Sequence, residues 1–154
     1  MKRYIGTKII EAEPAARVTG MDFTQRIQPV NQPISKGDTY ELGYKVVYPD
    51  GYESWSPKDV FEEAYRPTDG MSFGMAIEAA KKGKKIARAG WNGKNQYVEL
   101  AYGISYVNND CEIVNVKHDN IGTKAMAFVG TSGVQLGWLA SQADMLADDW
   151  FIVD

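Results

Sequence analysis

The chain has 154 residues, 44% of them hydrophobic, which is enough to bury a core as one compact domain or as two small modules. A formal net charge of -3 argues against binding to polymeric nucleic acid, which usually requires a basic surplus. A single cysteine excludes an intrachain disulfide, and no apolar run approaches the ~20 residues of a membrane span. The first residues lack the apolar stretch of a signal peptide, so we expect a cytoplasmic protein.

The first part of the chain predicts a small β-hairpin and helix module. We expect an edge strand at residues 4–13, an irregular segment at 15–36, and a hairpin at 41–55 that turns at Pro49-Asp50-Gly51. The two-residue period of the first hairpin strand predicts one buried face, formed by Leu42, Tyr44, Val46 and Tyr48.

A helix is predicted directly after this hairpin, over residues 57–66. Ser56 has the chemistry of an N-cap, and Pro57 suits the first helical position. The predicted buried stripe consists of Val60, Phe61, Ala64 and Tyr65. Residues 67–70 contain a proline and a glycine and no core-forming side chain, so we predict a first module at 1–66, a linker at 67–70 and a second module at 71–154.

The second module predicts a mostly antiparallel sheet with little helix. Ser72 is the expected N-cap of a helix that ends near residue 82, before Gly83. Short strands are predicted at 84–91, 96–102, 125–129, 134–140 and 149–153, with a helical turn at 141–147. Residues 104–124 are ambiguous, although 112–116 has the composition of a further strand. The predicted fold class is therefore α+β, with one N-terminal helix, a short C-terminal helix and the preceding hairpin module.

Few residues suit catalysis or metal binding. His118 is the single histidine and has no Cys or His partner at ligand spacing, so we expect a surface residue and no metal site. Cys111 lies among acidic neighbours, which disfavour a thiolate. The pairs Glu62-Glu63 and Asp148-Asp149 are adjacent in sequence and do not automatically converge on one substrate atom. We therefore predict no catalytic residue and no cofactor.

A run of cations in the second module could favour an anion, although such a run on its own more often forms a solvated surface. Within fourteen positions that contain no acid lie Lys81, Lys82, Lys84, Lys85, Arg88 and Lys94. Arg88 suits bidentate contacts to phosphate, and it is close in sequence to the indole of Trp91 and the amide of Asn92. A tryptophan in a glycine-flanked turn either covers the core or stacks on a purine.

The segment SQADMLADDW also permits two interpretations. Ser141 can cap a short helix, with Asp144 completing a capping box. The free amides at the same helix start can also attract a phosphate.

Two blocks, MSFGMAIEAAKKGKKIARAGWNGKNQYVEL and GWLASQADMLADDWFIV, closely resemble the Thoeris anti-defence type 2 family of phage proteins. The resemblance covers residues 71–154. It implies a small α+β protein that assembles as a homo-oligomer, typically a tetramer, in the cytoplasm of the infected bacterial host. Its implied activity is to sequester glycocyclic ADP-ribose signals made by a Toll/interleukin-receptor-type enzyme, without degrading them. For some relatives the resemblance also implies binding of cyclic dinucleotides.

Carried over position by position, the family pattern implies a ligand site formed by Phe73, Arg88, Trp91, Asn92, Ser141, Gln142, Ala143, Asp144 and Met145. In this hypothesis Trp91 stacks on adenine and Arg88 contacts the pyrophosphate. Asp144 or Asn92 bonds the base or ribose edges. Phe73 and Trp138 are equally compatible with a place in the core, and Trp150 favours the core. The N-terminal run YPDGYESWSPKDVFEEAYRP resembles a segment recurrent in hypothetical phage proteins, and it implies no activity.

Two other classes of function stay open at this point. One is an enzyme that hydrolyses a cyclic dinucleotide or oligonucleotide, with Asp144, Asp148 or Asp149 assisting water. The other is a protein interaction module, whose binding face would be the aromatic residues of the hairpin, Tyr44, Tyr48, Tyr52 and Trp55.

Overall fold

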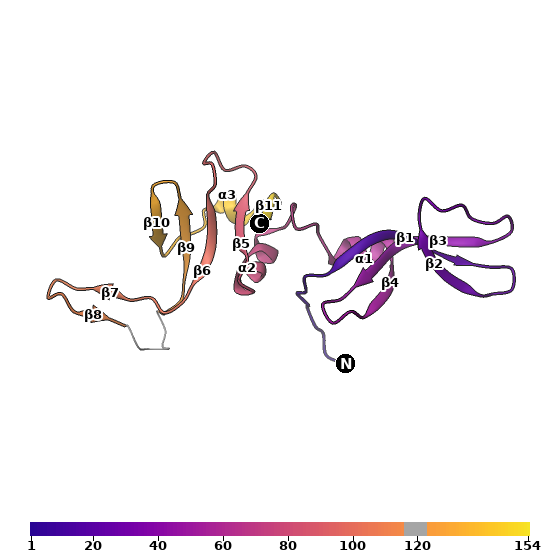
Figure 1. The fold of residues 1–154 in the computed structure, drawn as a ribbon, viewed down its shortest axis with the longest axis horizontal. Coiled ribbons are helices and arrows are strands. Elements are labelled where there is room, and N and C mark those ends of the chain that lie inside the picture. Colours follow the sequence, from indigo (N-terminus) through magenta and orange to yellow (C-terminus); the bar gives the residue numbers. More distant parts are fainter. Residues whose placement is uncertain (116–122) are drawn as a thin grey trace. The chain divides into compact units, whose positions relative to one another are not determined.

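The computed structural model describes residues 1–115 and 123–154, so His118 lies outside the described residues. The chain divides into two compact units, Met1–Arg66 and Pro67–Asp154 (Figure 1). Every strand pairing in both units is antiparallel, which confirms the predicted α+β class with a mostly antiparallel sheet. No helix among the described residues has the length and apolar character needed to cross a membrane.

The first unit is a four-stranded sheet in the order β2-β1-β3-β4, with one short helix. Its elements are β1 (Glu11–Thr19), β2 (Gln25–Pro29), β3 (Thr39–Val47), β4 (Glu53–Pro57) and α1 (Lys58–Ala64). The helix packs on one sheet face through Phe61, whose ring stacks on Tyr44 at 4.1 Å between centroids. The other face carries Trp55, which lies against Gly43 and under the guanidinium of Arg17.

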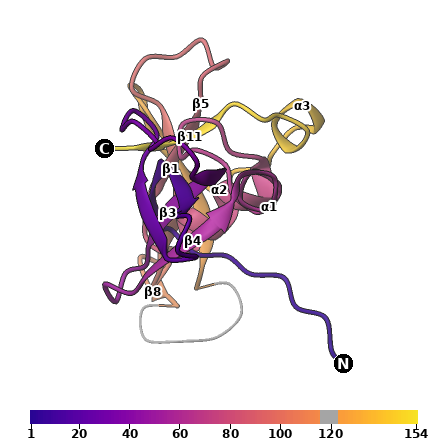
Figure 2. The same cartoon turned by 90° about the vertical axis from the view of Figure 1, so that its right-hand side faces the viewer.

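The hairpin of β3 and β4 is confirmed, but the prediction for the preceding residues is wrong. The residues before Glu11 form no helix or strand and run as an extended segment to the N-terminus (Figure 2). The segment expected to be irregular contains the second half of β1 and all of β2. These strands were missed because β1 includes Pro14 and β2 has polar residues at most positions, so neither shows a strong apolar period.

The helix after the hairpin forms, with two differences from the prediction. Pro57 rather than Ser56 occupies the N-cap, and no side chain bonds the first helical amides. Val60 and Ala64 are exposed, since the helix is short and contacts the sheet mainly through Phe61 and the following Tyr65. Leu42 is also exposed, so the predicted apolar face of β3 is buried only in part.

The second unit is a five-stranded sheet in the order β10-β9-β6-β5-β11, with α2 packed on one face. The strands are β5 (Lys85–Arg88), β6 (Tyr97–Ala101), β9 (Ala125–Gly130), β10 (Gly133–Leu136) and β11 (Trp150–Val153). A separate hairpin of β7 (Tyr106–Val107) and β8 (Ile113–Val114) extends away from this sheet (Figure 1). The predicted strand at 134–140 is too long, because the chain leaves β10 after Leu136.

The helix α2 (Phe73–Lys81) begins at Ser72, whose side chain accepts a hydrogen bond from the amide of Met75, as the sequence predicts. Its inner face is formed by the small residues Ala76, Ala79 and Ala80, which are all buried. Small side chains bring the helix close to the sheet, where the fully buried indole of Trp150 occupies the core. The start of the unit is fixed to β11, because Met71 and Trp150 exchange both backbone hydrogen bonds.

The short helix α3 (Gln142–Met145) lies between β10 and β11 in the sequence. Ser141 and Asp144 form the predicted capping box around its first turn. The indole N–H of Trp150 donates to the carbonyl of Asp144 at 2.9 Å. The backbone carbonyl of Asp144 therefore attaches this helix to the core residue Trp150.

Candidate functional site

The candidate site is built around the loop between β5 and β6, residues 89–96. Its first residues are fixed to Asp149, just before β11. The amide of Ala89 donates to the Asp149 carbonyl at 3.1 Å, and the amide of Gly90 donates to Asp149 Oδ2 at 2.8 Å. The backbone of Trp91 is turned by a hydrogen bond from its amide to the carbonyl of Arg88, at 3.2 Å. These contacts fix the position from which the Trp91 ring projects.

Arg88 joins this loop to two aspartates from the C-terminal segment. Its Nε donates to Asp149 Oδ1 at 2.8 Å, while its Nη1 donates to Asp144 Oδ1 at 2.9 Å and to the Ala143 carbonyl. The side chain is only 17% exposed. The hydrogen bonds that the guanidinium donates, first to Asp149 and then to Asp144, raise the pKa of Arg88. Nε and Nη1 are thus engaged inside the protein, so a phosphate contact through either nitrogen would have to displace one of these acceptors.

Asp144 is the centre of the network. Its Oδ1 accepts hydrogen bonds from Arg88 and from the indole N–H of Trp91, the latter at 3.0 Å. Its Oδ2 accepts from both the amide and the hydroxyl of Ser141. Burial alone would raise the pKa of Asp144, but the hydrogen bonds from Trp91, Ser141 and Arg88 outweigh it and lower the pKa to about 2. The carboxylate is therefore ionised at neutral pH.

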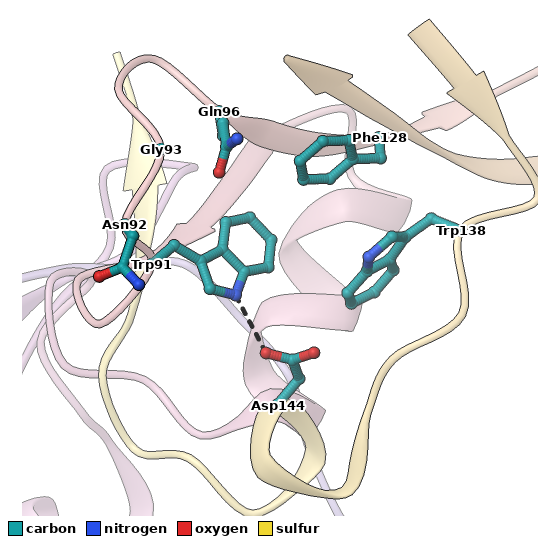
Figure 3. A pocket seen from close by; sticks show the side chains of 7 residues that line it. All are labelled: Trp91, Asn92, Gly93, Gln96, Phe128, Trp138 and Asp144. Carbon is teal, nitrogen blue, oxygen red and sulfur yellow. Dashed lines mark hydrogen bonds between the residues drawn. The ribbon is translucent and has the colours of Figure 1, made fainter.

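An open pocket of about 360 Å³ lies beside this network, within the size range of small-molecule sites (Figure 3). Its lining combines aromatic rings, two side-chain amides, one carboxylate and a glycine, namely Trp91, Phe128, Trp138, Asn92, Gln96, Asp144 and Gly93. The rings of Phe128 and Trp138 stand edge-on to Trp91, at 5.7 and 6.0 Å between centroids. The pocket can hold a flat apolar ring whose rim is polar.

The structure brings four of the residues predicted from the sequence to this place. Trp91, Asn92 and Asp144 line the pocket, and Arg88 lies behind it, bound to Asp144. Trp91 combines both roles that its sequence context allowed, because the half-buried ring also packs edge-on against the core residue Trp150 at 5.4 Å. Part of the ring is core and part is a pocket wall.

The other predicted residues do not line the pocket. Phe73 packs on Trp150, with 5.4 Å between the ring centroids, and belongs to the core. Ser141 is the helix cap, and Ala143 contributes its carbonyl to Arg88. Gln142 and Met145 are exposed on α3.

Sequence reasoning missed Gln96 and Phe128, and it left Trp138 open between the core and the site. Gln96 directly precedes β6 and Phe128 lies within β9, so both look like ordinary sheet residues. Only the pairing of β6 with β9 brings their segments together, with Val98 opposite Phe128. The lysines of the cationic run are exposed and none lines the pocket.

The described residues contain no cluster of three or more metal-ligating side chains. Asp144, which lines the pocket, and Asp149, which pairs with Arg88, both have lowered pKa values. For Asp149 the main cause is the hydrogen bond from Arg88. Such carboxylates are weak bases at neutral pH. The arrangement is therefore better suited to binding than to proton transfer.

Comparison with known proteins agrees with the site's location in the second unit. The model of the Thoeris anti-defense 2-like domain matches residues 71–153. A relative named Thoeris anti-defense 2, from Bacillus phage SP01, is 32% identical over an alignment of 94 residues that covers 54% of this chain and 94% of that protein. The match therefore includes the pocket, the Arg88 network and α3, and the chain belongs to the Thoeris anti-defense 2-like family.

Proposed function

We propose that this protein is a phage anti-defence protein that binds a nucleotide-derived immune signal of the glycocyclic ADP-ribose type and withholds it without degrading it. It acts in the cytoplasm of the infected bacterial host. The family and the phage origin of the relative support an anti-defence role. The proposed identity of the ligand rests on the chemistry of the pocket.

The observation that carries the proposal is the aromatic pocket itself. The partly accessible face of Trp91 offers a stacking surface for a purine, worth ~1–3 kcal/mol per base. Phe128 and Trp138 flank that surface, and the amides of Asn92 and Gln96 supply hydrogen-bond donors and acceptors beside it. An adenine fits this combination of a flat apolar body and a polar edge.

The charges around the pocket favour the base over the phosphates as the group that enters it. Asp144 is the charged residue of the lining, and its partner Arg88 is shared with Asp149. The nearest exposed cation in the loop is Lys94, two residues from both Asn92 and Gln96. We therefore place the pyrophosphate outside the aromatic pocket, on the Lys94 side of the loop.

Sequestration without turnover is consistent with the chemistry of this site. Withholding a signal requires affinity and copy number, with no need for a base or nucleophile. Asp144 and Asp149 are each bonded to Arg88, and their lowered pKa values make them poor acceptors of a proton from water. The same assay that measures capture also tests this point.

The test is to incubate the protein with glycocyclic ADP-ribose, isolate the complex, denature it and analyse the released ligand by mass spectrometry. We expect the ligand to return intact. Trp91→Ala should lose capture and also some stability, because the ring packs against the core. Tyr52→Ala, which removes an exposed aromatic of the first unit, should capture like wild type. Recovery of ligand fragments would indicate an enzyme. If the protein captures a cyclic dinucleotide in the same assay but does not capture glycocyclic ADP-ribose, the signal is a different one.

We further propose that the protein works as a homo-oligomer, with a tetramer favoured. The edge strand β10 supports this, since all four of its residues are exposed, including the apolar Val134 and Leu136. An exposed apolar sheet edge is a common surface for self-association.

A further inference from the structure

Gln96 is a polar side chain that lines the pocket but takes no part in the hydrogen-bond network around Asp144. Figure 3 shows its amide turned into the pocket beside the Trp91 ring and toward Phe128, while Asn92 lies at the outer rim. Gln96 is half-buried, yet within the described residues its amide makes no hydrogen bond. An amide placed between aromatic rings has one donor side and one acceptor side available for a ligand.

A glycine leaves the space that this side chain occupies. A Cβ atom on Gly93 would lie 1.9 to 2.1 Å from the three terminal atoms of the Gln96 amide. The side chain is therefore folded back over its own loop, with its amide held beside the pocket.

Of the other polar side chains of the lining, Asn92 lies at the outer rim and Asp144 is less suited to reading a base. Both oxygens of Asp144 already accept hydrogen bonds, from Trp91, Arg88 and Ser141. A carboxylate also has no donor, whereas an amide can pair with an edge that presents an amino group beside a ring nitrogen. Adenine has that edge, and side-chain amides recognise it through two hydrogen bonds at once.

We propose that Gln96 determines specificity in this pocket by pairing with the 6-amino edge of an adenine that stacks on Trp91. Its Oε1 accepts from the amino group and its Nε2 donates to the adjacent ring nitrogen. This inference rests on the proposed function, because it assigns the adenine of the captured signal to a particular side chain. It names a contact of this chain that the sequence pattern did not indicate.

The experiment is a cycle of two proteins and two ligands measured by calorimetry. The proteins are wild type and Gln96→Met, which keeps the length of the side chain and removes the amide. The ligands are glycocyclic ADP-ribose and its analogue with purine in place of adenine, which lacks the amino group. Gln25→Met, a matched change at an exposed position of β2, is the control variant.

For wild type and Gln25→Met we expect the purine analogue to bind roughly tenfold more weakly than the adenine ligand. Gln96→Met should bind the adenine ligand about as weakly as wild type binds the purine analogue. Its affinities for the two ligands should differ by no more than roughly a factor of two. Thermal unfolding of Gln96→Met should match wild type, because the amide has no partner in the protein. Equal discrimination by wild type and Gln96→Met would overturn the assignment while leaving capture intact. Failure of wild type to bind glycocyclic ADP-ribose at all would instead overturn the proposed function.

Discussion

At the scale of single residues, the site depends on one carboxylate that makes several contacts at once. Asp144 caps α3 with Ser141, holds the indole N–H of Trp91 and pairs with Arg88. Charged hydrogen bonds of this kind are stronger than neutral ones, and here they join a helix start, a loop and a strand end. The orientation of the pocket wall and the stability of this corner therefore depend on the same ionised group.

This coupling predicts an acid dependence of stability. The pKa of Asp144 falls from 3.8 to about 2 on folding, so its contribution is complete above the unfolded value. That contribution is lost as the pH decreases from 3.8 through about 2, because protonation breaks the charged hydrogen bonds. We expect Asp144→Asn to lower the unfolding midpoint near neutral pH by roughly 5 °C and to flatten its dependence on pH in that acid range.

The measurement is thermal unfolding followed by circular dichroism at a series of acid pH values. Asp148→Asn is the matched control, since Asp148 is a neighbouring exposed carboxylate. The control should retain the wild-type dependence on pH. The same slope for wild type and Asp144→Asn would show that this carboxylate is not the group responsible.

At the scale of elements, the loop between β5 and β6 links the network to the pocket. Its first residues bond Asp149, and its last residue, Gln96, turns back over Gly93 before β6 begins. The loop is short, and both of its ends are held by strands of one sheet. Small changes in its backbone should therefore alter ligand contacts more than they alter folding.

Gly93→Ala tests that expectation. Its new Cβ would overlap the Gln96 amide, which is the flexible end of a side chain and can move away without disturbing the core. We expect weaker binding of glycocyclic ADP-ribose, by roughly the same tenfold factor as for Gln96→Met, and a midpoint within about 2 °C of wild type.

Calorimetry and thermal unfolding of the same preparation provide both values. Gly70→Ala adds a Cβ that meets no atom within 4 Å and serves as the control. Wild-type affinity in Gly93→Ala would mean that the ligand does not contact the Gln96 amide in its observed position.

At the scale of the whole molecule, every pocket residue and every member of the Arg88 network comes from Pro67–Asp154. The first unit buries side chains of its own, among them Ala15, Ala16, Val18 and Val46, and Phe61 stacks on Tyr44. This stacking turns Tyr44 toward α1, so the residue does not belong to an exposed aromatic binding face.

We therefore expect residues 67–154 alone to fold and to bind glycocyclic ADP-ribose within roughly a factor of two of the full chain. Sedimentation should give a tetramer for both, since the exposed edge strand β10 is retained. Unfolding of the fragment, or a much weaker affinity, would assign a supporting role to the first unit. A monomer that still binds the ligand would contradict the proposed assembly.

The sequence by itself determined the features that depend on neighbours three or four positions away. The Ser72 cap of α2, the capping box of Ser141 and Asp144, and the turn at Asp50-Gly51 are all local hydrogen-bond patterns, and all of them form. The α+β class and the family also follow from local composition and from two contiguous blocks of sequence. The strands β1 and β2 were missed because their burial depends on partners elsewhere in the sheet.

Only the tertiary structure decided what the site residues do. Arg88 meets carboxylates 56 and 61 positions away, which turns an expected phosphate ligand into the partner of Asp144 and Asp149. The aromatic pocket exists because sheet register and the chain after β10 bring Trp91, Phe128 and Trp138 together, and the same register places Gln96 beside them. The side-chain types were visible in the sequence, but their partners were not, because antiparallel pairing joins segments without any fixed spacing along the chain.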